Sequence, residues 1–472
     1  MRSHEVTMTQ EQPRATLTNR LLLGYGVGAV GTGVFATIPG LLLMFYMTDT
    51  LGISAALAGL AVFLPKIWDV ISDPLVGVIS DRTRTSWGRR RPYLLAGALT
   101  LPLFFYLLFS APESASPTVG FVYVLIMFTL SATAYTVFTV PYVAMPAEMT
   151  DDYHEATRLM SWRMALMTVG ILAAGAVAPM LVKRGGGGLA GYRVMALGIA
   201  LVIGVAMLSA FFGTRRAPFE HPPEREGPPP RWTTQVVDAF RNPHYRRLVL
   251  THHVVAIGIG CTLANVAYIA KYLVGDRGLA PEDIVTLLFV SLVLPTIIMM
   301  PPWVYISRRI GKRDSYYYAI LLFAAGSLPM WFAASMPLWS SCLCVAIMGL
   351  GFAGCQLCSF SMLPDTIQSE RALTGARRDG IFSGIWLASD KGGIAIGGLL
   401  ASGVLAFTGF IESKGELVTQ PASALAGIAI NSSLVPTTMF LLSLLVLRRY
   451  TLSKTALDQL LADPEDRADR AS

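Results

Sequence analysis

Apolar runs of about twenty residues or more recur along nearly the whole chain, and they decide the fold class before any motif is considered. A helix needs about twenty apolar residues to cross a hydrocarbon core roughly 30 Å thick. An open sheet would leave backbone groups unsatisfied in lipid, so the spans must be helices. We expect an all-α membrane protein with twelve transmembrane helices, at residues 18–48, 52–80, 92–111, 119–146, 160–182, 192–213, 247–274, 282–306, 315–335, 338–363, 379–409 and 423–447.

The composition excludes several other classes of protein. Charged residues make up 14% of the chain and the mean hydropathy is +0.54, whereas about a quarter of a soluble domain is charged. The net charge of +7 is spread over alternate loops, so we expect no nucleic-acid partner. The five cysteines lie in apolar segments and are odd in number, which predicts no disulfide framework. No nucleophile–base set, phosphate loop or metal cluster is visible, so we expect no enzyme and no cofactor beyond a coupling cation.

Basic residues gather at the termini and in every second connection, as in the turn DRTRTSWGRRR at residues 81–91. Connections rich in lysine and arginine stay in the cytoplasm. We therefore expect a multi-pass protein of the plasma membrane, the inner membrane of a bacterium, with both termini cytoplasmic. A monomer in contact with membrane lipid is the expected state.

A proline-rich polar stretch divides the chain into two parts. The halves echo each other weakly, with basic turns after the second and the eighth spans. Parallel six-helix repeats resemble the architecture of major facilitator transporters. We expect an N-terminal six-helix bundle at 1–213, a cytoplasmic loop at 214–246 that is irregular or only partly helical, a C-terminal bundle at 247–450 and a cytoplasmic tail at 451–472.

The segment PKIWDVISDPLVG, residues 65–77, places charges where a membrane helix should have none. Lys66, Asp69 and Asp73 are the only charged residues of the second predicted span, and their spacing puts all three on one helical face. A charge at mid-membrane costs about 2.5–3.5 kcal/mol on insertion scales. Two carboxylates one turn apart form a competent site for Na⁺ or a shared proton. The alternative is a packing salt bridge, but one lysine cannot neutralise both carboxylates.

Two cytoplasmic connections carry charges that could act as gates. We interpret them as ion pairs that hold the two halves together in one state and break in the other, although topology alone explains any single arginine equally well. The acidic connection EMTDDYHEATR lies near enough in the expected fold to partner these arginines. The candidate gating residues are Asp81, Arg89, Arg90, Arg91, Glu148 and Asp365.

The stretch KIWDVISDPLVGVISDRTRTSWGRRRPYLL resembles the signature of the glycoside–pentoside–hexuronide:cation symporters, a branch of the major facilitators. AYTVFTVPYVAMPAEM is similar to that family's fourth helix, and PDTIQSE with DKGG to its tenth and eleventh. The resemblance implies that Asp69 and Asp73 coordinate the coupling cation, which is Na⁺ or H⁺. It implies further ligands at Ser72, in place of an asparagine, and at Thr136.

The same resemblance implies a substrate site that departs from the family pattern. Arg163 and Lys391 match basic residues near the substrate, and both lie inside predicted spans. The family's sugar-binding acids fall at Gly33 and Thr139, and one of its indoles falls near Gln356. Other residues that could form a weaker polar site include Tyr135 and Trp386, although each is often simply interhelical packing.

The leading hypothesis is a cation-coupled symporter of a sugar, glycoside or related small organic solute. Because the expected carboxylates are missing, an anionic sugar or an amphipathic anion such as a lysophospholipid also fits. An uncoupled facilitator or membrane sensor, with the acids as structural partners of Lys66, is the alternative from another class. His252 and His253 open the seventh span without visible partners, so we expect them at the membrane interface.

Overall fold

The structure is a computed structural model that describes residues 17–113, 116–150, 152–215, 217, 232–274, 278–374, 379–415, 418–452, 457 and 459. These residues form helices joined by short connections, with no strand among them. The first half contains α1 (Asn19–Ile38), η1 (Pro39–Leu43), η2 (Tyr46–Thr50), α2 (Ala55–Arg82), α3 (Arg91–Leu108), α4 (Pro117–Ala144), α5 (Pro146–Met149), α6 (Tyr153–Arg184) and α7 (Gly188–Gly213). The rest comprises α8 (Trp232–Arg241), α9 (Pro243–Tyr268), η3 (Ile269–Leu273), α10 (Pro281–Ile310), α11 (Lys312–Ser327), η4 (Leu328–Phe332), α12 (Leu338–Thr374), α13 (Asp379–Phe407), α14 (Ala422–Ser432) and α15 (Leu434–Leu447).

Eleven helices of the described chain are long and apolar enough to cross a membrane. The predicted span 315–335 lacks such a helix, because α11 has only 16 residues before it tightens into the 3₁₀ helix η4. α11 still packs against α12 and α15, and it occupies the position of the ninth predicted span. The predicted all-α membrane fold is confirmed, with the count of twelve supported approximately.

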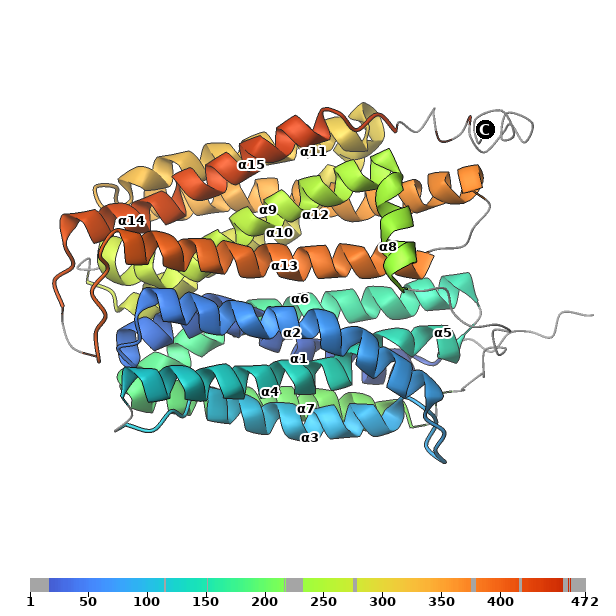
Figure 1. Ribbon diagram of the computed structural model, residues 1–472, viewed down its shortest axis with the longest axis horizontal. Helices are drawn as coiled ribbons and strands as arrows, with labels where there is room; N and C mark the ends of the chain where they lie inside the picture. Colours follow the sequence, from blue (N-terminus) through green and yellow to red (C-terminus); the bar gives the residue numbers. More distant parts are fainter. Residues whose placement is uncertain are drawn as a thin grey trace, which may run out of the picture.

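Most helices run along the long axis of the molecule and form two bundles side by side, with α9–α15 above α1–α7 in the view of Figure 1. α1 packs against α6 and α7 in the first bundle, and α9 packs against α13 and α15 in the second. The bundles meet where α2 contacts α13 and where α6 contacts α10. Any side chain at the α2–α13 contact therefore lies between the two halves.

Close backbone approach holds each bundle together. A Cβ at Gly170 would lie 2.4 Å from the Val30 carbonyl oxygen, and one at Gly397 would lie 2.1 Å from the Ile257 carbonyl oxygen. Only glycine permits these approaches. The van der Waals contacts that they allow stabilise the bundle, because lipid provides no hydrophobic driving force between helices.

Helix boundaries differ from the expected ones where apolar patterning ends before the helix does. α6 begins at Tyr153 and α12 runs to Thr374, so both extend beyond their predicted spans. α8 is the helical part of the central loop, and α9 begins at Pro243, inside the range expected to be loop. The last span is broken at Ser433, because Pro436 cannot donate the backbone bond that would continue α14 into α15.

Candidate cation site and gates

Asp69 is the most deeply buried charge of α2, with an exposed fraction of 1%. Lys66 Nζ lies 3.3 Å from its Oδ2, while Oδ1 has no hydrogen-bond partner among the described residues. Burying a carboxylate oxygen without a partner is costly. Asp69 therefore offers one oxygen to a cation or a proton.

Asp73, one turn further along α2, is held from two other helices. Thr136 Oγ1 of α4 donates a hydrogen bond of 2.7 Å to its Oδ1. Lys391 Nζ of α13 lies 2.5 Å from its Oδ2. Because α13 belongs to the second bundle, this ion pair joins the two halves at the predicted cation site. The sequence analysis considered Lys66 as the one lysine available to neutralise the two carboxylates, whereas the fold brings Lys391 to Asp73 as a second.

Ser72 adds another unused oxygen to this face. Its side chain is buried, and Oγ has no hydrogen-bond partner among the described residues. Residues three apart on a helix are neighbours, so Ser72 lies next to Asp69. No group of three His, Cys, Asp or Glu side chains in the described chain could hold a metal ion. The candidate ligands are two carboxylates and two hydroxyls, which are oxygen donors of the kind that hard cations prefer.

Two predicted substrate residues, Tyr135 and Arg163, lie within electrostatic range of each other. Tyr135 of α4 is within electrostatic range of Lys391, Arg163 and Asp69, and its ring stacks on Phe35 with centroids 4.8 Å apart. Arg163 of α6 has a buried Nε without a hydrogen-bond partner among the described residues. Arg163 has no carboxylate partner among the described residues, and an arginine of this kind inside a membrane span can bind an anion.

Gly33 lies at a helix contact, and its substrate role stays a prediction. It is buried in α1, and a Cβ there would lie 2.5 Å from the Met167 carbonyl oxygen of α6. Its small size serves the α1–α6 contact. Thr139, the other position that replaces a sugar-binding acid, is half-buried on α4 one turn after Tyr135.

Two predicted substrate residues of the second half, Gln356 and Trp386, differ in how accessible they are. Gln356 is half-buried on α12. Trp386 of α13 is 1% exposed, and its indole stacks on the His252 ring with centroids 4.1 Å apart. The indole is therefore covered in this structure, which leaves its substrate role a prediction.

The two histidines of α9 have partners that sequence reasoning missed. His252 is buried, and its Nε2 lies 3.0 Å from Asp390 Oδ1 of α13. His253 Nδ1 lies 2.9 Å from the Ser389 carbonyl oxygen. His252 is therefore buried between α9 and α13, and its expected place at the membrane interface stays a prediction. The available signal was Asp390, an acid beside Lys391 inside an apolar span.

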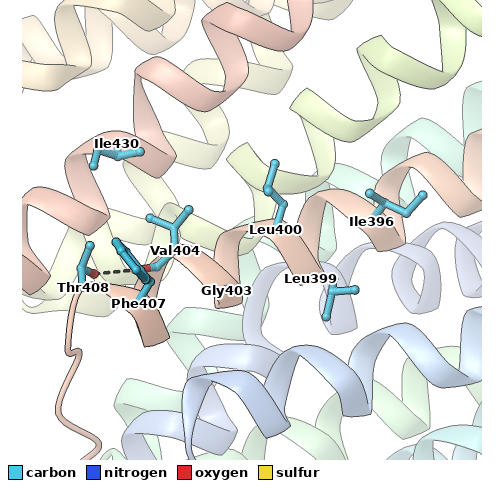
Figure 2. A pocket seen from close by; sticks show the side chains of 8 residues that line it. All are labelled: Ile396, Leu399, Leu400, Gly403, Val404, Phe407, Thr408 and Ile430. Atoms are coloured by element: carbon cyan, nitrogen blue, oxygen red, sulfur yellow. Dashed lines mark hydrogen bonds between the residues drawn. The ribbon is translucent and has the colours of Figure 1, made fainter.

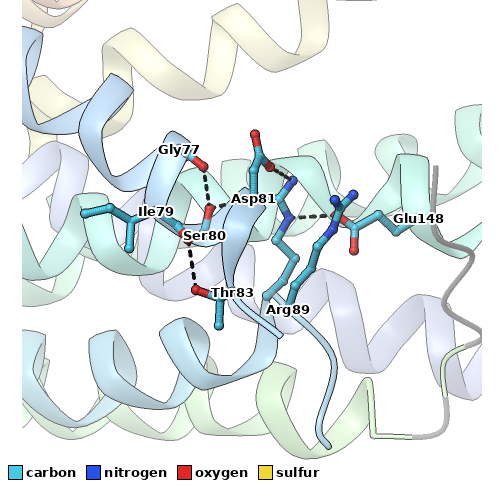
Figure 3. A network of polar contacts seen from close by, with 8 residues as sticks. Gly77, Ile79, Ser80, Asp81, Thr83, Arg89 and Glu148 are labelled. Atoms are coloured by element: carbon cyan, nitrogen blue, oxygen red, sulfur yellow. Dashed lines mark hydrogen bonds and ion pairs between the residues drawn. The ribbon is translucent and has the colours of Figure 1, made fainter. Parts of the chain in front are cut away.

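Two arginines at the α2–α3 turn, Arg89 and Arg90, converge on one carboxylate (Figure 3). Arg89 Nη2 and Arg90 Nε lie 2.9 and 2.7 Å from Glu148 Oε1, at the start of α5. Arg90 also pairs with Asp81 at the end of α2 and donates to Ser80. These pairs tie α2, the α2–α3 turn and α5 together within one half.

The second half contains a counterpart, since Lys312 Nζ of α11 lies 2.5 Å from Asp365 Oδ2 of α12. Arg91 differs from its neighbours: it lies over the Phe211 ring of α7, 4.8 Å from the centroid, and donates to the Phe211 carbonyl oxygen. Among the described residues, the contacts of these candidate gating residues lie inside one half. Closure between halves stays a prediction.

A different set of contacts joins the halves at the opposite end of the molecule. Asp49 Oδ1 of η2 lies 2.5 Å from Lys271 Nζ and accepts a hydrogen bond of 2.7 Å from the Tyr272 hydroxyl. Ser413, between α13 and α14, donates to the same oxygen at 3.1 Å. Asp49 is nearly buried, so these charge-assisted bonds are among the strong ones. The sequence analysis did not identify this residue.

An apolar cavity of 540 Å³ lies apart from all of these charges (Figure 2). It is lined by residues of α13 and α14 and by Thr408. The Thr408 hydroxyl already donates a hydrogen bond of 2.8 Å to the Val404 carbonyl oxygen. Phe407 at its edge is 93% exposed. A site without an available polar group cannot orient a sugar, so this cavity is not a candidate for the substrate.

Residues 24–454 match the profile of a family described as "MFS/sugar transport protein". The chain belongs to this sugar-transport family of the major facilitators. The resemblance that the second span carries is thereby confirmed, and the protein is a membrane transporter and no enzyme.

Relatives over almost the full length of this facilitator are named as transporters. A candidate glycoside/cation symporter of Escherichia coli K12, YagG, is 28% identical over 454 residues, 93% of each chain. The isoprimeverose transporter of Lactiplantibacillus pentosus is 27% identical and covers 90% of this chain and 87% of its own. A glucuronide carrier protein homolog of E. coli K12 is 24% identical over 96% of both chains. These relatives support a symporter of small solutes.

The fold agrees with solved facilitator structures. The nucleoside transporter NupG, crystallised as a point mutant, superposes with a TM-score of 0.64 over 90% of this chain and 98% of its own. Its sequence identity is only 14%, so this likeness concerns the fold alone.

Proposed function

We propose that the protein is a cation-coupled symporter of a sugar, glycoside or related small organic solute that works by alternating access. The observation that carries the proposal is the environment of Asp73. This carboxylate sits between Thr136 of its own half and Lys391 of the other half. It is one turn from Asp69, whose Oδ1 has no partner among the described residues.

A cation at these acids would change the contact between the halves. Na⁺ or H⁺ on Asp73 competes with Lys391 for the same carboxylate, so its binding weakens the α2–α13 ion pair. Substrate binding beside the released ammonium group then becomes more favourable. Coupling of this kind is worth about 1–3 kcal/mol and acts equally in both directions.

The two basic side chains near Tyr135 favour an anionic solute such as a uronide. Arg163 and Lys391 supply positive charge near Tyr135, and neither Gly33 nor Thr139 supplies the carboxylate that would bind a neutral sugar through its hydroxyls. A relative named as a glucuronide carrier homolog agrees with this choice. An amphipathic anion such as a lysophospholipid is the alternative with the same charge.

Alternating access needs gates at both ends. The Asp49–Lys271 contact is the proposed outer gate, because it joins the halves at the end opposite the arginine turns. The cytoplasmic gate would involve Glu148 and Asp365, each paired here within its own half. Both termini are proposed to be cytoplasmic, in a monomer of the bacterial inner membrane.

One observation favours the second candidate, an uncoupled facilitator or sensor. Each acid of the candidate cation site already has a lysine, Lys66 for Asp69 and Lys391 for Asp73. The site is therefore charge-balanced without any added cation. In that case the pairs serve packing alone, as buried ion pairs often do.

Two experiments separate these candidates. A thermal-shift screen of sugars, uronides and lysolipids with and without Na⁺, at several pH values, identifies a solute whose binding responds to a cation. Asp73→Asn then removes the charge in proteoliposomes. Under symport, gradient-driven accumulation disappears while exchange of the solute survives.

The matched control is Asp314→Asn, which removes an exposed acid at the start of α11. Binding that ignores both Na⁺ and pH, or accumulation that survives Asp73→Asn, contradicts the symport proposal and favours the facilitator.

A further inference from the structure

His252 and Asp390 form a second ionisable pair inside the membrane, outside the α2 site. The imidazole Nε2 lies 3.0 Å from the carboxylate Oδ1, and the two residues come from α9 and α13. The side chains are 2% and 32% exposed, respectively. An ionised carboxylate only accepts hydrogen bonds, so Nε2 carries the proton of this bond.

The surroundings of His252 isolate this contact. Trp386 stacks on one face of the imidazole, at 4.1 Å and an interplanar angle of 16°, and Phe360 of α12 meets it edge-on at 5.9 Å. Asp390 is the charged group among the described contacts of His252. The neighbouring ionisable groups are His253, which faces the Ser389 carbonyl, and Lys391, which pairs with Asp73.

We propose that His252 and Asp390 form a proton-binding site of the transporter, separate from the carboxylates of α2. Histidine is the side chain whose ordinary charge change falls between pH 5 and 8. Net uptake of one proton from solvent leaves N–H bonds on both ring nitrogens, and Nε2–H is still donated to Asp390. The resulting imidazolium is neutralised by the carboxylate, and the Trp386 ring adds a cation–π contact.

Two features make the pair suited to exchange protons instead of only packing helices. Asp390 is about a third exposed while its partner is buried, so the pair has one accessible end. An ionisable residue in a membrane span is expensive to insert and is usually functional. A packing contact between α9 and α13 would need neither charge, since Gly260 and Gly397 already bring their backbones together.

Proton uptake would also change the charge beside Lys391. Lys391 keeps Asp73 as its partner whether or not the imidazole is charged. Proton uptake therefore adds one positive charge between α9 and α13, which favours an anion in the site. This consequence rests on the proposed function, whereas proton binding itself does not.

The test uses the intact protein in lipid nanodiscs with histidine labelled with ¹³C at Cε1. The pH is varied from 5 to 9 and the proton is the only ligand. His252→Gln identifies the His252 signal, and a variant that lacks the five other histidines identifies it independently if His252→Gln does not fold. His253→Gln is the matched control, because His253 faces a carbonyl oxygen instead of a carboxylate.

We expect the His252 signal to change with pH, and its midpoint to move in Asp390→Asn because the carboxylate that neutralises the imidazolium is then absent. The His253 signal should keep its midpoint in that variant. A His252 signal that stays constant over the whole range overturns the proposal, as does a midpoint that Asp390→Asn leaves in place. If His252 titrates but the separate solute screen finds no transported solute, the proposed function is contradicted and the proton site still stands.

Discussion

Asp73 and Lys391 are 318 positions apart in the chain, yet their charged groups lie 2.5 Å apart between α2 and α13. This ion pair crosses from one bundle to the other at the predicted cation site. Both side chains are 30% exposed, so solvent reaches the pair and an entering cation can compete for the carboxylate.

Removing the Lys391 ammonium should leave Asp73 with only Thr136. We expect Lys391→Ala to destabilise the protein by less than the ~3–5 kcal/mol of a fully buried pair, because solvent screens this one. Lys391→Ala combined with Asp73→Asn should recover part of the loss, since no charge is then unpaired. A double-mutant cycle of melting temperatures measures this coupling, and purely additive losses would contradict it.

The outer contact should control opening at the end opposite the arginine turns. Asp49→Asn keeps the oxygen that accepts from Tyr272 but loses the charge that holds Lys271. A hydrogen bond to a charged group contributes about 1.5–3 kcal/mol, so the open population should rise about tenfold or more. Spin labels at Thr50 and Lys414 should show longer distances.

Glu113→Gln is the control for that measurement. Glu113 lies at the same end, but its partner Arg193 belongs to the same half. Distances that lengthen equally in both variants would show that Asp49 is no gate.

The ion pairs of Glu148 should contribute more to the stability of the protein than the ion pair of Asp365. Glu148 is 4% exposed and accepts from both Arg89 and Arg90, whereas Asp365 is 30% exposed and faces one lysine. Glu148→Gln should therefore lower the melting temperature clearly more than Asp365→Asn. Equal shifts in the two variants would mean that solvent screens both sites alike.

Gly33 should be required for packing instead of substrate contact. A Cβ there would meet the Met167 carbonyl oxygen at 2.5 Å, and such overpacking typically costs about 1–3 kcal/mol. Gly33→Ala should lower the melting temperature, while Gly384→Ala, with nothing within 4 Å of the added carbon, should leave it unchanged or raise it. An unchanged melting temperature in Gly33→Ala would restore the substrate interpretation.

The sequence alone predicted the membrane class, the two halves and the acids of α2. These follow from local patterns: apolar runs set the spans, and the three- and four-residue spacing of Lys66, Asp69 and Asp73 sets one helical face. The expected ninth span was the weakest case, because helix α11 tightens into η4 after 16 residues.

Only the tertiary structure decided which charges meet. Lys391 reaches Asp73, Lys271 reaches Asp49 and His252 reaches Asp390, over separations of 318, 222 and 138 residues. No periodicity along the chain encodes such pairs, because they depend on which helices pack and at what depth. Helix packing also gave Gly33 and Trp386 buried positions that their residue types do not reveal. Local spacing thus fixed the face that carries the charges, and the packing of two bundles fixed their partners.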